Sequence, residues 1–147
     1  MTRDLSKRGF SRFFLKEIND TEVFLKRTIL NYIDIDKKSF KNFLQQLEPK
    51  ILKRIKNKKI KKIIFTGMGS CHTASVVIAN YLSNILSNAS INHIKVEATV
   101  ASEGSGFYLS ENMEDTMVVV IAQSGTTIDT NIFAKLAKIR GAYTIAL

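Results

Sequence analysis

The sequence predicts an α/β fold in which helices cover both faces of a parallel sheet. Short apolar runs alternate with helix-length amphipathic segments from Ile60 to the end of the chain. The connections between them are short, and several contain glycine. One run, Met117–Ile121, is continuously apolar, which is typical of a parallel strand buried on both faces. These observations predict a four-stranded parallel sheet with right-handed crossovers and the strand order 2-1-3-4.

Composition limits the class of protein. The chain has 147 residues, of which 45% are hydrophobic and 24% charged, so one domain with a sizeable core is expected. No apolar run is long enough for a transmembrane helix, and the N-terminus has no apolar leader. The single cysteine, Cys71, cannot form an internal disulfide. Together these features predict a cytoplasmic protein. Two histidines and one cysteine give no metal-ligand spacing, and we expect no metal and no cofactor.

The net charge of +9 is concentrated in the N-terminal part of the chain. Residues 1–62 hold 18 of the 22 lysines and arginines, and the densest run is Lys53–Lys62. We interpret this run as a solvated helix face and a linker. Binding of nucleic acid or of a membrane surface is the less favoured alternative, and we expect neither partner.

Residues 1–58 are predicted to form a helical segment that packs on a domain of residues 59–147. Asn19–Glu22 has the spacing of a capping box and predicts the start of a helix. A further helix is predicted over Lys38–Leu47. Pro49 suits a first helical turn, so a short basic helix is expected from there to about Asn57.

Strands and helices are predicted to alternate through the second segment. In order, the expected elements are a strand at Ile60–Thr66, a helix at Thr73–Ser87, a strand at Ile94–Thr99, a short helix within Ser102–Leu109, a strand at Thr116–Ala122, a helix at Ile128–Arg140 and a strand at Ala142–Leu147. The last strand would leave an open sheet edge, so we expect a homo-oligomer or a partner chain.

Two polar turns follow the first and third strands. Gly67–Cys71 contains two glycines and a serine, and Gln123–Thr127 supplies an amide and several hydroxyls. Neither turn has the pattern of a Walker A loop or of a dinucleotide fingerprint. In the order 2-1-3-4 the two turns meet at the carboxyl edge of the sheet, where helix N-termini favour an anion such as a phosphate. The alternative interpretation is a tight turn without a ligand and ordinary N-capping by Ser124 or Thr126.

Several segments in collinear order resemble sugar isomerase (SIS) domains. Ala122–Thr130 is similar to their Ser-Gln-Ser-Gly-Glu-Thr-x-Asp-Thr motif, and Gly69-Ser70-Cys71 is similar to their Gly-Thr-Ser turn. Val96-Glu97 and Ala101-Ser102-Glu103 resemble signals of the isomerase half of glucosamine-6-phosphate synthase, as do residues 7–18.

The resemblance implies a three-layer, flavodoxin-like SIS fold, truncated before its fifth strand, that binds a sugar phosphate such as fructose 6-phosphate. The implied substrate-binding residues are Gly69, Ser70, Cys71, Gln123, Ser124, Gly125 and Thr127. Cys71 and Ala122 stand where the family has phosphate-binding serines, so two hydroxyls are missing.

The resemblance also implies what this chain lacks. On this resemblance we expect the chain to lack a glutaminase domain and the second SIS subdomain, which carries the glutamate base in the family, so no catalytic residue is assigned. We expect the substrate-binding half of a glutamine–fructose-6-phosphate transaminase (isomerizing) of amino sugar metabolism, inactive alone and partnered by a second SIS subunit. The alternative is a non-catalytic module that senses a sugar phosphate or binds a partner. Catalysis by Cys71 and His72 is less favoured, because adjacent helical residues point in different directions.

Overall fold

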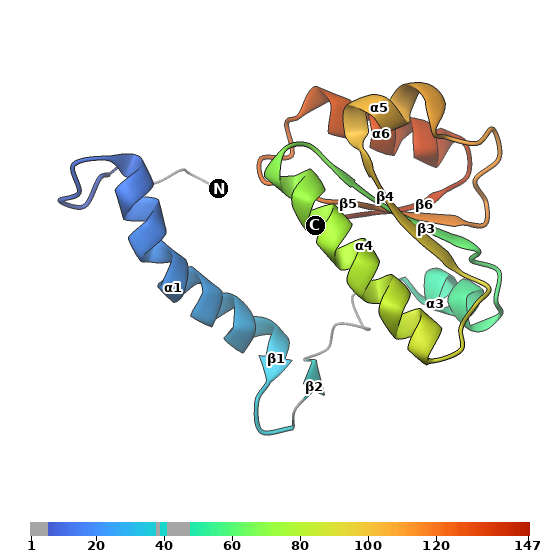
Figure 1. Ribbon diagram of the computed structural model, residues 1–147, viewed down its shortest axis with the longest axis horizontal. Coiled ribbons are helices and arrows are strands. Elements are labelled where there is room, and N and C mark those ends of the chain that lie inside the picture. The colour runs from blue at the N-terminus through green and yellow to red at the C-terminus, as the bar shows by residue number, and fades with distance from the viewer. Residues whose placement is uncertain (1–5, 38, 41–47) are drawn as a thin grey trace. The chain divides into compact units, whose positions relative to one another are not determined.

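The computed structural model describes residues 6–37, 39–40 and 48–147, which form two compact units (Figure 1). One unit is Met1–Glu48 and the other is Pro49–Leu147. The expected division at residue 58, and the packing of the N-terminal helices on the domain, stay predictions. Within the described residues, no helix is both long enough and apolar enough to cross a membrane.

The first unit contains one long helix and a small hairpin. Helix α1 spans Phe13–Tyr32 and leads directly into strand β1, Ile33–Asp34. Strand β1 pairs with strand β2, Ser39–Phe40, in antiparallel orientation. The backbone N–H of Lys37 donates to Oδ1 of Asp34 at 3.1 Å and stabilises the connecting turn.

The prediction that a helix begins at Asn19–Glu22 is wrong, because α1 runs through this segment without a break. Asn19 Nδ2 donates to the carbonyl oxygen of Leu15 at 2.8 Å, and Thr21 Oγ1 donates to that of Glu17 at 2.9 Å. These polar side chains bond to the backbone one turn earlier, as they can within a helix. They therefore do not cap a new helix.

The prediction of a helix over Lys38–Leu47 is wrong at Ser39 and Phe40, which form β2. The rest of that prediction falls on residues 38 and 41–47, which lie outside the described residues. The basic helix that was expected to begin at Pro49 is confirmed. Helix α3 spans Pro49–Lys56 and buries Ile51 completely.

The second unit is built on a four-stranded parallel sheet. Its strands are β3 (Lys62–Gly67), β4 (Lys95–Val100), β5 (Thr116–Val120) and β6 (Tyr143–Ala146). Their spatial order is β4-β3-β5-β6, and every neighbouring pair is parallel. This confirms the predicted order 2-1-3-4. Because Thr66 pairs with Val120, the carboxyl ends of β3 and β5 lie side by side.

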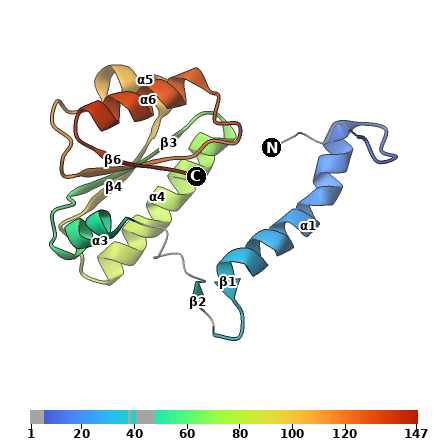
Figure 2. The same cartoon turned by 180° about the vertical axis from the view of Figure 1, so that it is seen from behind.

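Helices cover both faces of this sheet and complete the three predicted layers. Helix α4 (Ser70–Asn88) packs on β3 and β4. Helices α5 (Ala101–Phe107) and α6 (Ile128–Ile139) pack against each other and on the other face. Figures 1 and 2 show α5 and α6 on one side of the sheet and α3 and α4 on the opposite side.

The strands divide their side chains between two apolar layers. Ile64, Val118 and Val120 belong to a buried cluster with Phe133, which is fully buried on α6. Residues of opposite parity, such as Ile63, point to the other face, since side chains alternate along a strand. This packing fixes the ends of β3 and β5, and with them the two turns that follow.

Candidate functional site

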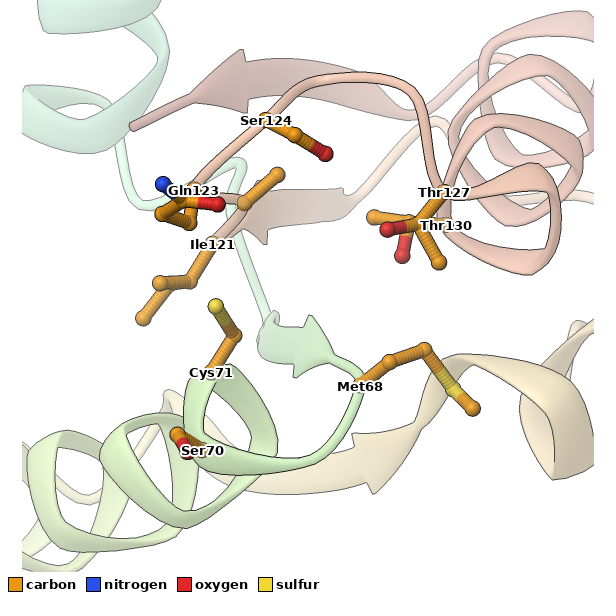
Figure 3. A pocket seen from close by; sticks show the side chains of 9 residues that line it. Met68, Ser70, Cys71, Ile121, Gln123, Ser124, Thr127 and Thr130 are labelled. Carbon is orange, nitrogen blue, oxygen red and sulfur yellow. The ribbon is translucent and has the colours of Figure 1, made fainter. Parts of the chain in front are cut away.

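A pocket of about 350 Å³ opens where β3 and β5 end (Figure 3). The backbone N–H of Ile121 donates to the carbonyl oxygen of Thr66 at 2.8 Å, so the turn after β5 begins beside the end of β3. The pocket is lined by Met68, Ser70, Cys71, Ile121, Ala122, Gln123, Ser124, Thr127 and Thr130.

Five of the seven predicted site residues lie on this pocket, namely Ser70, Cys71, Gln123, Ser124 and Thr127. The other two, Gly69 and Gly125, do not line it. Each of them has a positive φ, +55° and +68°, and shapes the turn that carries the lining residues. The structure therefore joins two turns that are far apart in the sequence into one concave surface.

The turn after β3 is tight. A Cβ atom on Gly67 would lie 2.9 Å from the backbone of Cys71 and 2.9 Å from the carbonyl oxygen of Ile121. The absence of a side chain at Gly67 thus allows α4 and the turn after β5 to approach each other. Helix α4 begins at Ser70, three residues earlier than predicted, with Gly69 as the N-cap residue.

This early start places Ser70 and Cys71 in the first turn of α4 rather than in the loop. The first backbone N–H groups of a helix lack partners within the helix. They carry the positive end of the helix dipole, which favours a bound anion. This wall of the pocket is therefore the N-terminus of α4, together with the side chains of Met68 and Cys71.

The turn after β5 is longer and richer in hydroxyls. Ser124 Oγ lies 2.9 Å from Thr126 Oγ1 and accepts a hydrogen bond from the backbone N–H of Thr126 at 3.3 Å. Asn131, which sequence reasoning did not single out, donates from Nδ2 to the carbonyl oxygen of Gly125 at 3.1 Å. These bonds hold the turn in one conformation.

Ordinary N-capping does not account for these hydroxyls. The N-cap residue of α6 is Thr127, and its side chain makes no capping hydrogen bond. The alternative interpretation of the turn, in which Ser124 or Thr126 serves as the cap, is therefore not what the structure has. The hydroxyl of Thr127 stays available to a ligand in the pocket.

Sequence reasoning missed Thr130 as a lining residue. It is only 3% exposed and lies one helical turn after Thr127, on the same side of α6. Residues three apart share a helix face, and this spacing is the signal that could have found it. Met68 and Ile121 also line the pocket and were not predicted.

None of the lining residues carries a formal charge. Helices α4 and α6 both begin at the pocket, and the N-terminal ends of their dipoles supply positive potential there. Hydroxyls and an amide are the side-chain donors. This arrangement can bind an anion, but it offers no carboxylate or imidazole for proton transfer.

The remaining side chains with groups for acid–base or metal chemistry do not line the pocket. Cys71 lines the pocket and His72 does not, although His72 follows it in the first turn of α4. His72 Nδ1 is buried with no hydrogen-bond partner among the described residues. Glu103 is exposed on α5. In the described part of the chain, no group of three side chains could hold a metal ion.

Glu97 has a structural environment on β4. Its carboxylate lies 2.5 Å from Lys62 Nζ and 3.0 Å from Lys95 Nζ. Partial burial raises the pKa of Glu97, but the two ammonium groups outweigh this effect and hold the pKa below its usual range. The same carboxylate raises the pKa of Lys95. Lys62 begins β3, so this charged cluster lies at the opposite end of that strand from the pocket.

Comparison with known proteins identifies relatives that align with almost the whole of this chain. A glutamine–fructose-6-phosphate aminotransferase (isomerizing) from Fusobacterium nucleatum is 29% identical over 144 residues, which is 97% of this chain and 21% of that protein. The enzyme of the same name from Methanococcus maripaludis is 30% identical over 96% of this chain and 20% of that protein. The chain thus spans about one-fifth of the length of these relatives. No protein-family profile matches it.

Solved structures share the fold. The C-terminal domain of glucosamine-fructose-6-phosphate aminotransferase from Francisella tularensis aligns with 97% of this chain and 36% of that one, with a TM-score of 0.70 and 20% identity. Glucosamine-6-phosphate deaminase from Thermotoga maritima aligns with 90% of this chain and 33% of that one, with a TM-score of 0.60 and 21% identity. The chain therefore has the sugar isomerase (SIS) fold and is homologous to a segment of the glutamine–fructose-6-phosphate aminotransferases.

Proposed function

We propose that this chain is an SIS domain that binds a sugar phosphate of the fructose 6-phosphate type. The observation that carries the proposal is the pocket itself, where two helix N-termini and the hydroxyl-rich turn of Gln123–Thr127 face one cavity. The names of the relatives, which refer to fructose 6-phosphate and glucosamine 6-phosphate, support the same class of ligand.

The phosphoryl group is assigned to the turn after β5. Ser124 and Thr127 supply hydroxyl donors, and Gln123 supplies an amide. The N–H groups at the start of α6 and of α4 add neutral donors and the favourable end of two dipoles. A hydrogen bond to a charged group contributes about 1.5–3 kcal/mol, so the loss of one hydroxyl is measurable.

The homology further supports a role in a glucosamine-6-phosphate synthase type of aminotransferase, and hence in amino sugar metabolism. In that role the chain binds substrate and another subunit or segment supplies the chemistry. Conversion of the ketose to an aldose needs a base within about 3 Å of the transferred proton. No lining residue is a carboxylate, a histidine or a lysine, so we expect binding without turnover by this chain alone.

A second candidate function is a non-catalytic module that senses a sugar phosphate or binds a partner. The observation in its favour is that Ala122 and Cys71 line the pocket with a methyl and a thiol. Hydroxyls at these two positions would bind a phosphate more strongly. The two functions share the ligand class and differ in whether a partner chain restores turnover.

Isothermal titration calorimetry with fructose 6-phosphate and glucosamine 6-phosphate tests the proposal. We expect Ser124→Ala and Thr127→Ala to weaken binding about 10-fold to 100-fold each. The matched control is Ser83→Ala, which removes the hydroxyl of an exposed residue on α4 that does not line the pocket. Parent-like affinity in both pocket variants would sink the assignment.

Turnover is tested separately. The purified chain is incubated with fructose 6-phosphate and ammonium, and glucosamine 6-phosphate and glucose 6-phosphate are sought by mass spectrometry. We expect no product above the protein-free control. Product that disappears in Glu103→Gln would make the chain a catalyst in its own right.

A further inference from the structure

Thr130 differs from the other buried hydroxyl side chains of the molecule. Five such side chains are less than 9% exposed in the described structure, and they are Thr66, Ser75, Thr99, Thr116 and Thr130. Four of them donate a hydrogen bond, to the carbonyl oxygens of Thr99, Cys71 and Val100 and to the carboxylate of Asp115, respectively. Thr130 has no side-chain hydrogen-bond partner within the described part of the chain.

The position of Thr130 in its helix explains this difference. A helical serine or threonine commonly donates to the carbonyl oxygen four residues earlier, and Ser75 does so to Cys71 at 2.9 Å. The residue four before Thr130 is Thr126, which precedes the N-cap residue and is not part of α6. The usual acceptor is therefore not in place. Thr130 Oγ1 is not among the buried atoms that lack a partner, so the hydroxyl is open to solvent or to a ligand.

The pocket is the open space that this hydroxyl faces. Thr130 lines it, and Figure 3 shows the side chains of Thr127 and Thr130 together at the start of α6, turned toward the cavity. Residues three apart on a helix have Cβ atoms about 5–6 Å apart, so one tetrahedral anion can accept hydrogen bonds from both hydroxyls. The hydroxyl of Thr127, which makes no capping hydrogen bond, and the unpartnered hydroxyl of Thr130 thus form a pair of donors.

We propose that Thr130 is a further ligand-binding residue, whose hydroxyl donates a hydrogen bond to the phosphoryl group of the bound sugar phosphate beside Thr127. The inference rests on the proposed function and extends the binding site from the polar turn into the first turn of α6. It makes the phosphoryl end of the ligand the deeply buried end.

The test compares Thr130→Val, which removes the hydroxyl at nearly constant shape, with Thr130→Ser, which keeps it. Dissociation constants are measured for inorganic phosphate and for fructose 6-phosphate, together with the melting temperature of each unliganded variant. We expect Thr130→Val to weaken both ligands by a similar factor of about 10 to 100, and Thr130→Ser to stay within about threefold of the parent. The melting temperature of Thr130→Val should equal or exceed that of the parent, because no internal hydrogen bond is lost.

Thr116→Val is the matched control, because its buried hydroxyl has a partner, Asp115, at the amino end of β5. It should lower the melting temperature and leave both affinities unchanged. If Thr130→Val lowers the melting temperature as much as Thr116→Val, the hydroxyl is structural and the inference is overturned.

The binding outcomes separate this inference from the proposed function. Parent-like binding by Thr130→Val, with Ser124→Ala still weakened, removes Thr130 from the site and leaves the function standing. Weakened binding of fructose 6-phosphate alone would place Thr130 on the sugar and contradict the phosphoryl assignment. A parent chain that binds neither probe overturns both proposals.

Discussion

The two turns that meet at the pocket occupy equivalent places in the fold but differ in chemistry. The turn after β3 is short, and α4 begins directly after Gly69. It presents Met68 and Cys71, with the exposed Ser70 beside them. The turn after β5 is longer, is held by Ser124 and Thr126, and presents hydroxyls and an amide.

This difference indicates a division of roles within one site. The first turn contributes close backbone approach and the N-terminus of α4, so its effect comes from shape and from the helix dipole rather than from side-chain donors. The second turn contributes the side-chain donors, so its effect comes from hydrogen bonding. Substitutions that change shape should therefore have the largest effects at the first turn, and those that remove a donor should have the largest effects at the second.

The largest effect is expected at Gly67. Gly67→Ala places a methyl 2.9 Å from two backbone groups, which must move apart, so we expect a loss of about 1–3 kcal/mol in the free energy of unfolding and weaker ligand binding. Chemical denaturation and calorimetry check this. Gly106→Ala is the control, because nothing lies within 4 Å of its added methyl and α5 should be unchanged or more stable. Equal stability of the two variants would contradict the close approach.

Removal of a single hydroxyl from either turn is expected to have a smaller effect, confined to ligand affinity. Ser124→Ala should weaken fructose 6-phosphate binding about 10-fold to 100-fold, and Ser70→Ala by less than about threefold. The reason is that Ser124 belongs to the turn to which the phosphoryl group is assigned, whereas Ser70 lies on the opposite wall, in the first turn of α4. A larger loss in Ser70→Ala than in Ser124→Ala, measured by calorimetry, would reverse the proposed division.

A gain of about threefold to tenfold in affinity is expected from Ala122→Ser. The new hydroxyl enters the pocket beside Gln123 and adds a donor to the phosphoryl group. Ala89→Ser, at the far end of α4, is the control and should leave the affinity unchanged. If Ala122→Ser binds no more tightly than the parent, this wall does not contact the phosphoryl group.

The smallest effect on ligand binding is expected from a substitution in the charged cluster of Lys62, Lys95 and Glu97, at the other end of β3. Because the pKa of Glu97 is lowered in the folded state, its contribution to stability is present above the unfolded pKa and is lost as the pH falls through the folded pKa. Glu97→Gln should therefore reduce the free energy of unfolding near neutral pH, by less than about 1 kcal/mol after solvent screening. This deficit should shrink below about pH 4.

Denaturation curves at several pH values measure this effect, with Glu103→Gln on the exposed face of α5 as the control. Ligand affinity at neutral pH should equal that of the parent in both variants. A deficit that grows on acidification would contradict the role of the two lysines.

Much of the second unit could be predicted from the sequence. The continuous apolar run Met117–Ile121 indicated a buried parallel strand, and the strand order followed from the alternation of elements. The order then implied that the turns after the first and third strands meet. Five of the predicted site residues accordingly line one pocket.

The rest depended on interactions that the sequence pattern does not reveal. The Asn19 side chain is typical of a cap, but within α1 it bonds to the carbonyl oxygen of Leu15. The early start of α4 at Ser70 depends on the positive φ of Gly69. Thr130 belongs to a helix in the sequence pattern, and its contact with the pocket depends on how α6 packs on the sheet.

Backbone amide chemical shifts report directly whether the two distant turns form one phosphate-binding site. Fructose 6-phosphate is titrated into ¹⁵N-labelled protein. We expect saturable shift changes at both turns with one dissociation constant, centred on the amides of residues 69–71 and 123–128. Shift changes confined to one turn, different dissociation constants for the two turns, or no change at either would contradict it.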